Sequence, residues 1–351
     1  MDVTVTDQGS DEREERMRMV AESAKGVLKS DRNRARALRF THPGFDLVKW
    51  AALAEQGWLM LRVPESWDGL GMGLSELSTI ARAMGGELTP EPIAMAALIA
   101  PDLPDDDLAA VLACEAVVLP AFAPYRAEPP HLRDGRLTGS VEPVPYAAGA
   151  SHFLVQTSDG AALVEASADG FRISIRESHD GGHLGTLILD SVPAKHVQSD
   201  MVRLREEAAL VLSAQLLGIA ESAFDITLTY LRDRKQFGHA IGTFQALQHR
   251  AVDLFLELNL MRASMEAAAA ALDSGAVDDD AERAVSLAKA RATRGVHLIT
   301  QAAIQLHGGI GYTDEADIGL YLRRAMTVGG LLGSEAFHRN RALRLSEELA
   351  V

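Results

Sequence analysis

A basic cluster stands in residues 232–249, which read RDRKQFGHAIGTFQALQH, inside a chain of 351 residues whose formal net charge is −15. Its cationic, aromatic and amide side chains include Arg232, Arg234, Lys235, Phe237, Phe244 and Gln245. Arginine grips phosphate through charge-assisted hydrogen bonds, and a nearby aromatic ring and amide would complete a site for the end of a nucleotide. Cations at a helix end also have a simpler explanation, because they balance the negative end of the helix dipole.

A second stretch that could bind a ligand is QLHGGIGY, residues 305–312. The helical pattern before it stops at Gly308 and Gly309, so backbone is exposed beside Gln305. A helix ending of the Schellman type would explain the glycines without any ligand. Taken singly, this stretch and the basic cluster each remain open to both interpretations.

Composition and charge exclude several classes of protein. The chain is 47% hydrophobic and 24% charged, which is enough to bury a large core in two or three domains. Its acidic balance argues against nucleic acid or an anionic membrane as a partner. The single cysteine, Cys114, rules out an internal disulfide and is expected to be a buried small hydrophobe, and no spacing of His and Asp predicts a metal site.

The ends and apolar runs of the chain predict a cytoplasmic location. The first residues, MDVTVTDQGSDEREERM, are polar and acidic, unlike a signal or transit peptide. No apolar run approaches the roughly 20 residues that a membrane span needs. We therefore expect a cytoplasmic protein without a membrane segment.

The hydrophobic periodicity changes twice and predicts three domains. Residues 1–114 have helical spacing, residues 115–200 hold short β-branched segments separated by turns such as Asp134-Gly135, and residues 201–351 return to long helical runs. Gly275 predicts a helix stop, and the Asp run 278–280 offers an N-cap for the next helix. The expected fold is mostly α with a central β domain: a helical domain, a small antiparallel sheet or barrel, and a C-terminal four-helix bundle.

The order and spacing of the two candidate stretches resemble a known family. RxxFG followed by FQ, then a helix and QxxGGxGY, resembles the C-terminal domain of the acyl-CoA dehydrogenases, and residues 53–85 are similar to that family's N-terminal helical domain. The resemblance implies the same three-domain fold, FAD bound at the contact between two subunits, and α,β-desaturation of an acyl-CoA thioester. It also implies a tetramer, with an electron-transfer flavoprotein as the usual electron acceptor.

The resemblance assigns the cofactor contacts of one subunit to this sequence. Arg234 would pair with the FAD diphosphate, and Phe237 and Gln245 would line that end. Gln305 would receive the diphosphate through its amide, and Gly308 and Gly309 through close backbone approach. This half of the family site is present.

The family's catalytic glutamate, which removes the α-proton while a hydride leaves for the flavin, is missing from its usual position. Aligning Arg323 with the family arginine places Leu332 where that glutamate stands. Some relatives carry the base at the position of Ala208, and Glu207 is one residue away, a turn of about 100° on a helix. Glu335 is a further weak candidate, more simply explained as a solvated carboxylate at a helix start. The catalytic residue is therefore unknown.

The β domain departs from the family as well. Residues 119–135, LPAFAPYRAEPPHLRDG, lack the Thr-Glu-Pro turn and the small residues that hold the flavin ring in relatives. The missing glutamate and the missing Thr-Glu-Pro turn both belong to the part of the family site that faces the flavin ring. We therefore expect a subunit that completes the FAD site of a homologous catalytic partner in a heterotetramer, as in bacterial enzymes that degrade steroid side chains.

Three alternatives remain open at this point. The chain could be a self-sufficient homotetrameric acyl-CoA dehydrogenase with a relocated base, Glu207 first. A flavin oxidase or monooxygenase of the same fold would need no glutamate in the usual position. A non-catalytic scaffold would bind no flavin, although it would then have no use for the cluster around Arg234.

Overall fold

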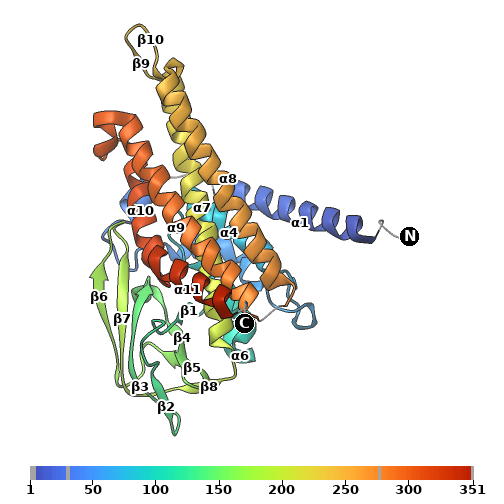
Figure 1. Ribbon diagram of the computed structural model, residues 1–351. Helices are drawn as coiled ribbons and strands as arrows, with labels where there is room; N and C mark the ends of the chain where they lie inside the picture. Colours follow the sequence, from blue (N-terminus) through green and yellow to red (C-terminus); the bar gives the residue numbers. More distant parts are fainter. Residues whose placement is uncertain (1–4, 29–31, 276–277, 349–351) are drawn as a thin grey trace.

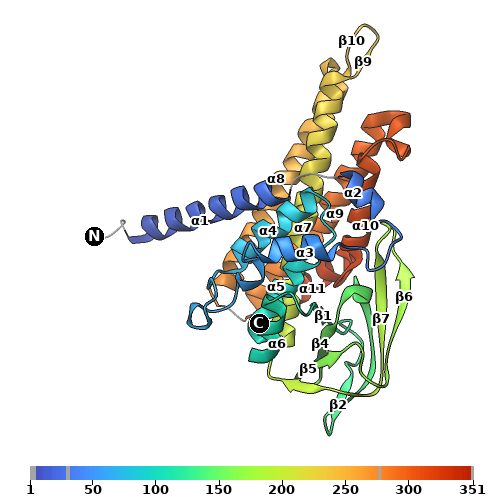
Figure 2. The same ribbon diagram turned by 180° about the vertical axis from the view of Figure 1, so that it is seen from behind.

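The computed structural model describes residues 5–28, 32–275 and 278–348, and it shows a helical N-terminal part, a central β part and a C-terminal helical bundle (Figure 1). The sheets lie on one side of the bundle, and the N-terminal helices lie against it except for the first, Val5–Val27, which projects away from it (Figure 2). The expected mostly α fold with a central β domain is confirmed. The strands of the β part lie between Val118 and Val197.

The N-terminal helices pack closely on the bundle because glycines remove side chains from the contact. These helices are α1 (Val5–Val27), α2 (Arg32–Ala37), α3 (Leu47–Ala54), α4 (Leu74–Gly86), α5 (Ile93–Ile99) and α6 (Asp105–Leu112). A Cβ on Gly85 of α4 would meet the carbonyl oxygen of Gln215 at 2.1 Å, and one on Gly218 would meet that of Arg82 at 1.8 Å. Larger residues would push α4 away from the helix that carries Gln215 and Gly218.

The β part consists of two four-stranded sheets. Its strands are β1 (Val118–Ala121), β2 (His131–Arg133), β3 (Arg136–Pro145), β4 (His152–Thr157), β5 (Gly160–Glu165), β6 (Phe171–Glu177), β7 (His183–Pro193) and β8 (Lys195–Val197). The predicted turn is present: Asp134 and Gly135 have φ of 48° and 71° and join β2 to β3. The expectation of one small antiparallel sheet or barrel differs in two respects, since the strands divide between two sheets and β1 pairs with β4 in parallel.

The C-terminal bundle has three long helices, and two shorter consecutive helices take the place of a fourth. Its helices are α7 (Met201–Asp233), α8 (Gln245–Asp273), α9 (Asp279–His307), α10 (Ile318–Gly330) and α11 (Glu335–Glu348). The predicted N-cap is confirmed, because the Asp278 side chain accepts a hydrogen bond from the backbone of Ala281 at 2.9 Å. The chain leaves the helical conformation after α10, where Leu332 and Gly333 have φ of 52° and 103°. This break, residues 331–334, carries the position of the family glutamate.

Helix α7 is the core helix of the molecule. It is long and apolar enough by composition to cross a membrane, but 72% of its most apolar window is buried inside the structure. It packs against α4, α8, α9 and α10 at once. Its apolar face is therefore used for packing within the protein, and the helix supplies one wall of the site described next.

Candidate functional site

Arg234 stands at the end of α7 with its side chain exposed. Its backbone leaves the helix there, with φ of −70° and ψ of 123°. Among residues 5–28, 32–275 and 278–348, its guanidinium has no acidic partner and no hydrogen-bond acceptor. A cation held outside the protein in this way remains available to an external anion.

The chain after Arg234 forms a short hairpin that projects beyond the bundle (Figures 1 and 2). Strands β9 (Lys235–Gln236) and β10 (His239–Ala240) pair across Phe237 and Gly238, whose φ values of 53° and 81° are those of a two-residue type I′ turn. The turn presents Phe237 with 86% of its surface exposed, in edge contact with Phe244 at 6.3 Å. An aromatic ring so far from the core is suited to contact another molecule.

The glycines of the second stretch lie at the end of α9 and leave backbone open. Gly308 has φ of 67°, a conformation that favours glycine, and a Cβ on Gly308 or Gly309 would meet no atom within 4 Å. Gln305 is exposed one turn earlier. The open backbone and the amide can both approach a ligand closely.

Tyr230 brings the two candidate stretches together. Its hydroxyl donates to the carbonyl of His307 at 3.1 Å, and the two rings stack with centroids 4.3 Å apart. Tyr230 is one turn before Arg234, and His307 directly precedes Gly308. An unpaired arginine, an exposed aromatic, free amides and open backbone fit a diphosphate, so these residues can hold that end of FAD.

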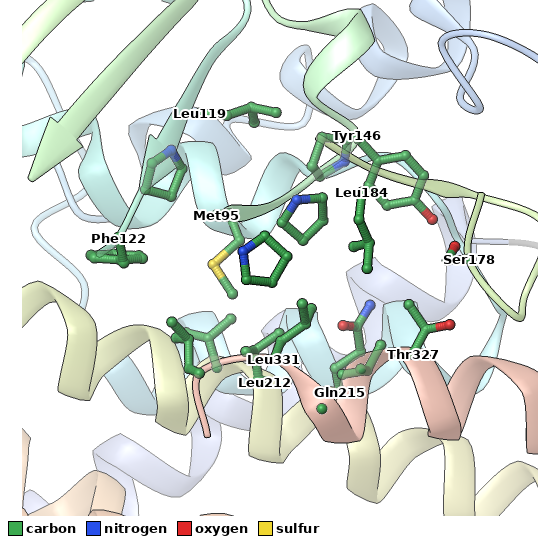
Figure 3. A pocket seen from close by; sticks show the side chains of 18 of the residues that line it. Met95, Leu119, Phe122, Tyr146, Ser178, Leu184, Leu212, Gln215, Thr327 and Leu331 are labelled. Atoms are coloured by element: carbon green, nitrogen blue, oxygen red, sulfur yellow. The ribbon is translucent and has the colours of Figure 1, made fainter. Parts of the chain in front are cut away.

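A cavity of about 420 Å³ lies where the three parts of the chain meet. Its walls come from α4, α5, α7, α10, the break after α10, and the β part. Figure 3 shows Met95, Leu119 and Phe122 toward one end, Tyr146 and Ser178 at the other, and Leu212, Gln215, Thr327 and Leu331 opposite them. Its volume is typical of small-molecule sites, and its lining is mostly apolar.

Leu332, at the position of the family glutamate, lines this cavity. Glu207 and Glu335, the two other candidate bases, do not. Glu207 is 1% exposed and accepts hydrogen bonds from Arg62 at 2.6 Å and Arg203 at 2.8 Å. Glu335 is at the start of α11, 4.0 Å from Arg339 and partly open to solvent. Neither carboxylate is placed to reach a molecule in the cavity.

The cavity wall supplied by residues 119–126 and 142–146 is poor in hydrogen-bond donors. Four prolines, which have no N–H, lie in this wall: Pro120, Pro124, Pro143 and Pro145. The N–H of Ala123 is already bonded to Gln156 at 3.1 Å. A flavin ring has several polar atoms along one edge, and the prolines of this wall offer them no backbone N–H.

Reasoning from sequence missed a charged cluster at one end of the cavity. Arg324 donates to Asp180 at 2.7 Å and to the hydroxyl of Tyr146 at 2.5 Å. Burial raises the pKa of Tyr146 to about 12, against the opposing effect of Arg324. Burial alone would raise the pKa of Asp180, but Arg324 and hydrogen bonds from Ser178 and Gly182 hold it below its ordinary value. The only sequence signal was the arginine pair 323–324 in an otherwise apolar segment.

Two further residues at the charged end of the cavity each have a buried polar atom without a partner in the described chain. His183 is 2% exposed, its Nε2 accepts the N–H of Ala148 at 3.0 Å, and its Nδ1 has no partner among the described residues. Glu91 is 1% exposed and accepts from Arg34 and the N–H of Asp46 through Oε1, while its Oε2 lacks a partner in the described chain. Both residues line the cavity.

Two buried bases hold the break that carries Leu332. Lys289, fully buried, donates to the carbonyl of Gly329 at 3.0 Å, and burial lowers its pKa to about 7. His338, also fully buried, lies with Nε2 2.7 Å from the carbonyl of Leu332. These contacts fix residues 329–333 as a wall of the cavity.

His338 predicts an acid-sensitive component of stability. Burial lowers its pKa to about 4, while the unfolded value is near 6.5. Between those values the unfolded chain binds more protons, so stability falls on acidification by up to about 1.4 kcal/mol per pH unit. His338→Gln, which keeps a donor but does not titrate, should flatten urea-unfolding stability between pH 6.5 and 4. The exposed control His131→Gln should leave the slope unchanged, and equal slopes for both variants and the parent would contradict the prediction.

Comparison with known proteins agrees with this arrangement. Residues 10–100 match the family model for the acyl-CoA dehydrogenase N-terminal domain, and residues 200–345 match that for the C-terminal domain. Acyl-CoA dehydrogenase IpdE2 of Mycobacterium tuberculosis is 30% identical over 309 residues, covering 85% of this chain and 86% of the relative.

Two solved structures are similar over almost the whole chain. The Tcur3481-Tcur3483 steroid ACAD G363A variant has a TM-score of 0.88 at 29% identity, with 96% of this chain and 99% of that chain covered. The ChsE4-ChsE5 complex from Mycobacterium tuberculosis has a TM-score of 0.84 at 25% identity, with 96% and 97% covered. The chain therefore belongs to the acyl-CoA dehydrogenase family of FAD-dependent oxidoreductases.

Proposed function

We propose that this chain is the subunit of a heteromeric acyl-CoA dehydrogenase that completes the FAD site of a homologous catalytic partner. Its own contribution is the diphosphate end, through Arg234, Phe237, Gln245 and the turn at Gly308-Gly309. The partner supplies the flavin-ring site and the base, and FAD supplies the hydride acceptor for desaturation. The assembly is expected in the cytoplasm, as a heterotetramer that passes its electrons to an electron-transfer flavoprotein.

The proposal rests on a difference between the residues for the diphosphate and the cavity. The cations and open backbone at the ends of α7 and α9 are exposed and unpaired in the described chain. The cavity, in contrast, has Leu332 in place of the glutamate and a proline-rich wall. A subunit that has only the residues for the diphosphate is useful when another chain binds the flavin ring.

Two of the similar solved structures support this kind of assembly. ChsE4-ChsE5 is described as a complex, and Tcur3481-Tcur3483 as a steroid ACAD named for two components. For the present chain, a bulky acyl-CoA is accordingly the substrate class we propose for the assembled enzyme.

One observation favours a self-sufficient enzyme as the second candidate. Glu91 lines the cavity and has an unpartnered oxygen, so it is better placed than Glu207 to act as a relocated base. Its other oxygen accepts a hydrogen bond from Arg34. This candidate requires a flavin ring within reach of Glu91, against the proline-rich wall described above.

The visible spectrum of the purified chain tests the proposal. Alone, the chain should contain well under one FAD per chain; co-expressed with a glutamate-bearing acyl-CoA dehydrogenase chain of its host, the complex should retain flavin that bleaches with acyl-CoA. A chain that is yellow by itself, bleaches with acyl-CoA and loses this response in Glu91→Gln would instead establish the self-sufficient enzyme. Flavin that reacts mainly with oxygen would indicate an oxidase, and absence of flavin in every complex a scaffold.

A further inference from the structure

The segment 329–333, which leads from the end of α10 into the break, has a strained backbone conformation. All of its residues except the first line the cavity. Leu332 has φ of 52°, a conformation that the Cβ of a leucine disfavours. Leu332 therefore keeps this conformation only while contacts with the rest of the protein stabilise it.

Two buried bases make such contacts with the carbonyl oxygens of the segment. Lys289 of α9 donates to the carbonyl of Gly329 at 3.0 Å and lies 3.5 Å from that of Gly333. Nε2 of His338, on α11, lies 2.7 Å from the carbonyl of Leu332. Both side chains are fully buried, and the segment is part of what separates them from water.

Neither base has an acidic partner among the residues that the structure describes. The remaining contact of the Lys289 ammonium is with the hydroxyl of Thr293 at 3.2 Å. The other ring nitrogen of His338 lies 3.5 Å from the hydroxyl of Ser286. A positive charge on either base is therefore buried without a counterion, which is costly.

The other ionisable groups around the two bases are engaged with one another or with backbone. Arg341 of α11 bonds to Glu206 of α7 at 2.6 Å and to Glu282 of α9. The Tyr125 hydroxyl donates to the same Glu206 carboxylate at 3.2 Å. His297 of α9 lies with Nε2 3.4 Å from a carbonyl of α10. Charged groups of α8 and α10 form the ion pairs Glu257–Arg291 and Arg324–Asp180.

Protonation of the two bases favours release of the segment. Burial lowers the pKa of Lys289 from 10.5 to about 7, and that of His338 from 6.5 to about 4. When the segment opens to water, each base returns to its ordinary pKa, so the open state binds more protons between the two values. Acidification therefore eases opening between pH 10.5 and 7 through Lys289, and between 6.5 and 4 through His338. Each effect is up to about tenfold per pH unit.

We propose that the segment 329–333 is a proton-operated gate in the cavity wall, which opens when Lys289 and His338 take up protons and closes when they release them. Lys289 gives the response around neutral pH, and His338 extends it to acidic pH. Opening removes Leu332 from the wall and admits water to this side of the cavity. The gate consists of residues of this chain alone, so it operates without flavin and without a partner chain.

Hydrogen–deuterium exchange of the flavin-free full chain, followed by mass spectrometry between pH 7 and 9, tests the gate. The readout is the protection factor of peptides that cover 329–333, in which the intrinsic dependence of exchange on pH is already divided out. Protection should rise about 10- to 100-fold over this range, because Lys289 loses its proton in the closed state and keeps it in the open state. Peptides from the core helix α7 report global unfolding and should be more protected at every pH.

Three variants assign the response to the two bases. Lys289→Met keeps a long apolar side chain but cannot take up a proton, so protection of 329–333 should no longer change between pH 7 and 9. Lys49→Met is the matched control and should leave the rise intact, because Lys49 also donates to a carbonyl, that of Val27 at 2.8 Å, but is only partly buried. His338→Gln should remove the dependence between pH 4 and 6.5 and leave that between 7 and 9.

Several results would overturn the inference. Equal protection of 329–333 and α7 at every pH would show that the segment opens only when the whole chain unfolds. Protection that stays constant between pH 7 and 9 in the unaltered chain would remove the gate, and so would a rise that survives in Lys289→Met. Loss of the rise in Lys49→Met as well would assign it to general charge. The pH series on the unaltered chain needs no variant, so it decides the matter even if Lys289→Met does not fold.

Discussion

Replacing Arg234 by alanine will strip flavin from the assembled enzyme, raising the dissociation constant for FAD by about 10- to 100-fold. Hydrogen bonds to a charged group contribute about 1.5–3 kcal/mol, and each 1.4 kcal/mol is a factor of ten in affinity. The side chain is exposed and has no partner in the described part of the chain, so its loss costs nothing inside the subunit. Its effect should therefore appear in flavin content and leave the melting temperature of the flavin-free chain unchanged.

The measurement is FAD per complex after gel filtration, with the dissociation constant from titration of the flavin-free complex. Arg232→Ala is the matched control, because Arg232 is another exposed cation in the last turn of α7. Arg234→Lys should be intermediate, since lysine keeps the charge but loses the planar fork that grips two phosphate oxygens. Equal losses from Arg232→Ala and Arg234→Ala would show a general electrostatic effect and remove the specific role of Arg234.

The residues that we propose for the diphosphate end lie in two short stretches of sequence, so they could be named without knowledge of the fold. Helix α9 ends at His307, beside Gly308 with φ of 67°, and helix α7 ends at Asp233, four residues before Phe237 with φ of 53°. The helix stop at Gly308 was predicted from the sequence, whereas the hairpin turn at Phe237-Gly238 was not. What the sequence did not show was the contact between Tyr230 and His307 that joins the two endings.

The cavity could not be predicted in the same way, because its polar end is assembled from distant segments. Glu91, His183 and Arg324 belong to different parts of the chain, and each carries a common residue type in an unremarkable local pattern. Their significance depends on burial and on which atoms lack a partner, and neither is encoded at short range. The break between α10 and α11 was also not predicted, because it depends on a positive φ at Leu332 as well as at Gly333.

Glu207 illustrates how a spacing argument differs from a structural one. On sequence it was a candidate base because it stands next to the position of Ala208 on a helix. In the structure Glu207 instead meets Arg62, which is 145 residues away, in the N-terminal part. The Glu207 carboxylate links two parts of the fold. A contact between residues so far apart cannot be predicted from the local sequence pattern.

Glu207→Gln is accordingly expected to destabilise the chain strongly, by about 3–5 kcal/mol, the usual cost of removing one partner from a buried ion pair. Glu207 is 1% exposed, and the Arg62 side chain is 14% exposed, so Arg62 would keep a charge with little access to water. Arg203 is 44% exposed and can turn to solvent. Urea unfolding of the chain should show a lower midpoint, and turnover per folded complex should be unchanged.

Two comparisons separate stability from catalysis. Glu335→Gln removes a carboxylate that is 37% exposed and 4.0 Å from its cation, so its effect should stay within about 0.5 kcal/mol, again with turnover intact. The double variant Arg62→Met with Glu207→Leu should recover much of the lost stability, because an apolar pair leaves no buried charge. If Glu207→Gln instead folds normally and turnover falls by orders of magnitude, Glu207 is the base, and the chain is catalytic in its own right.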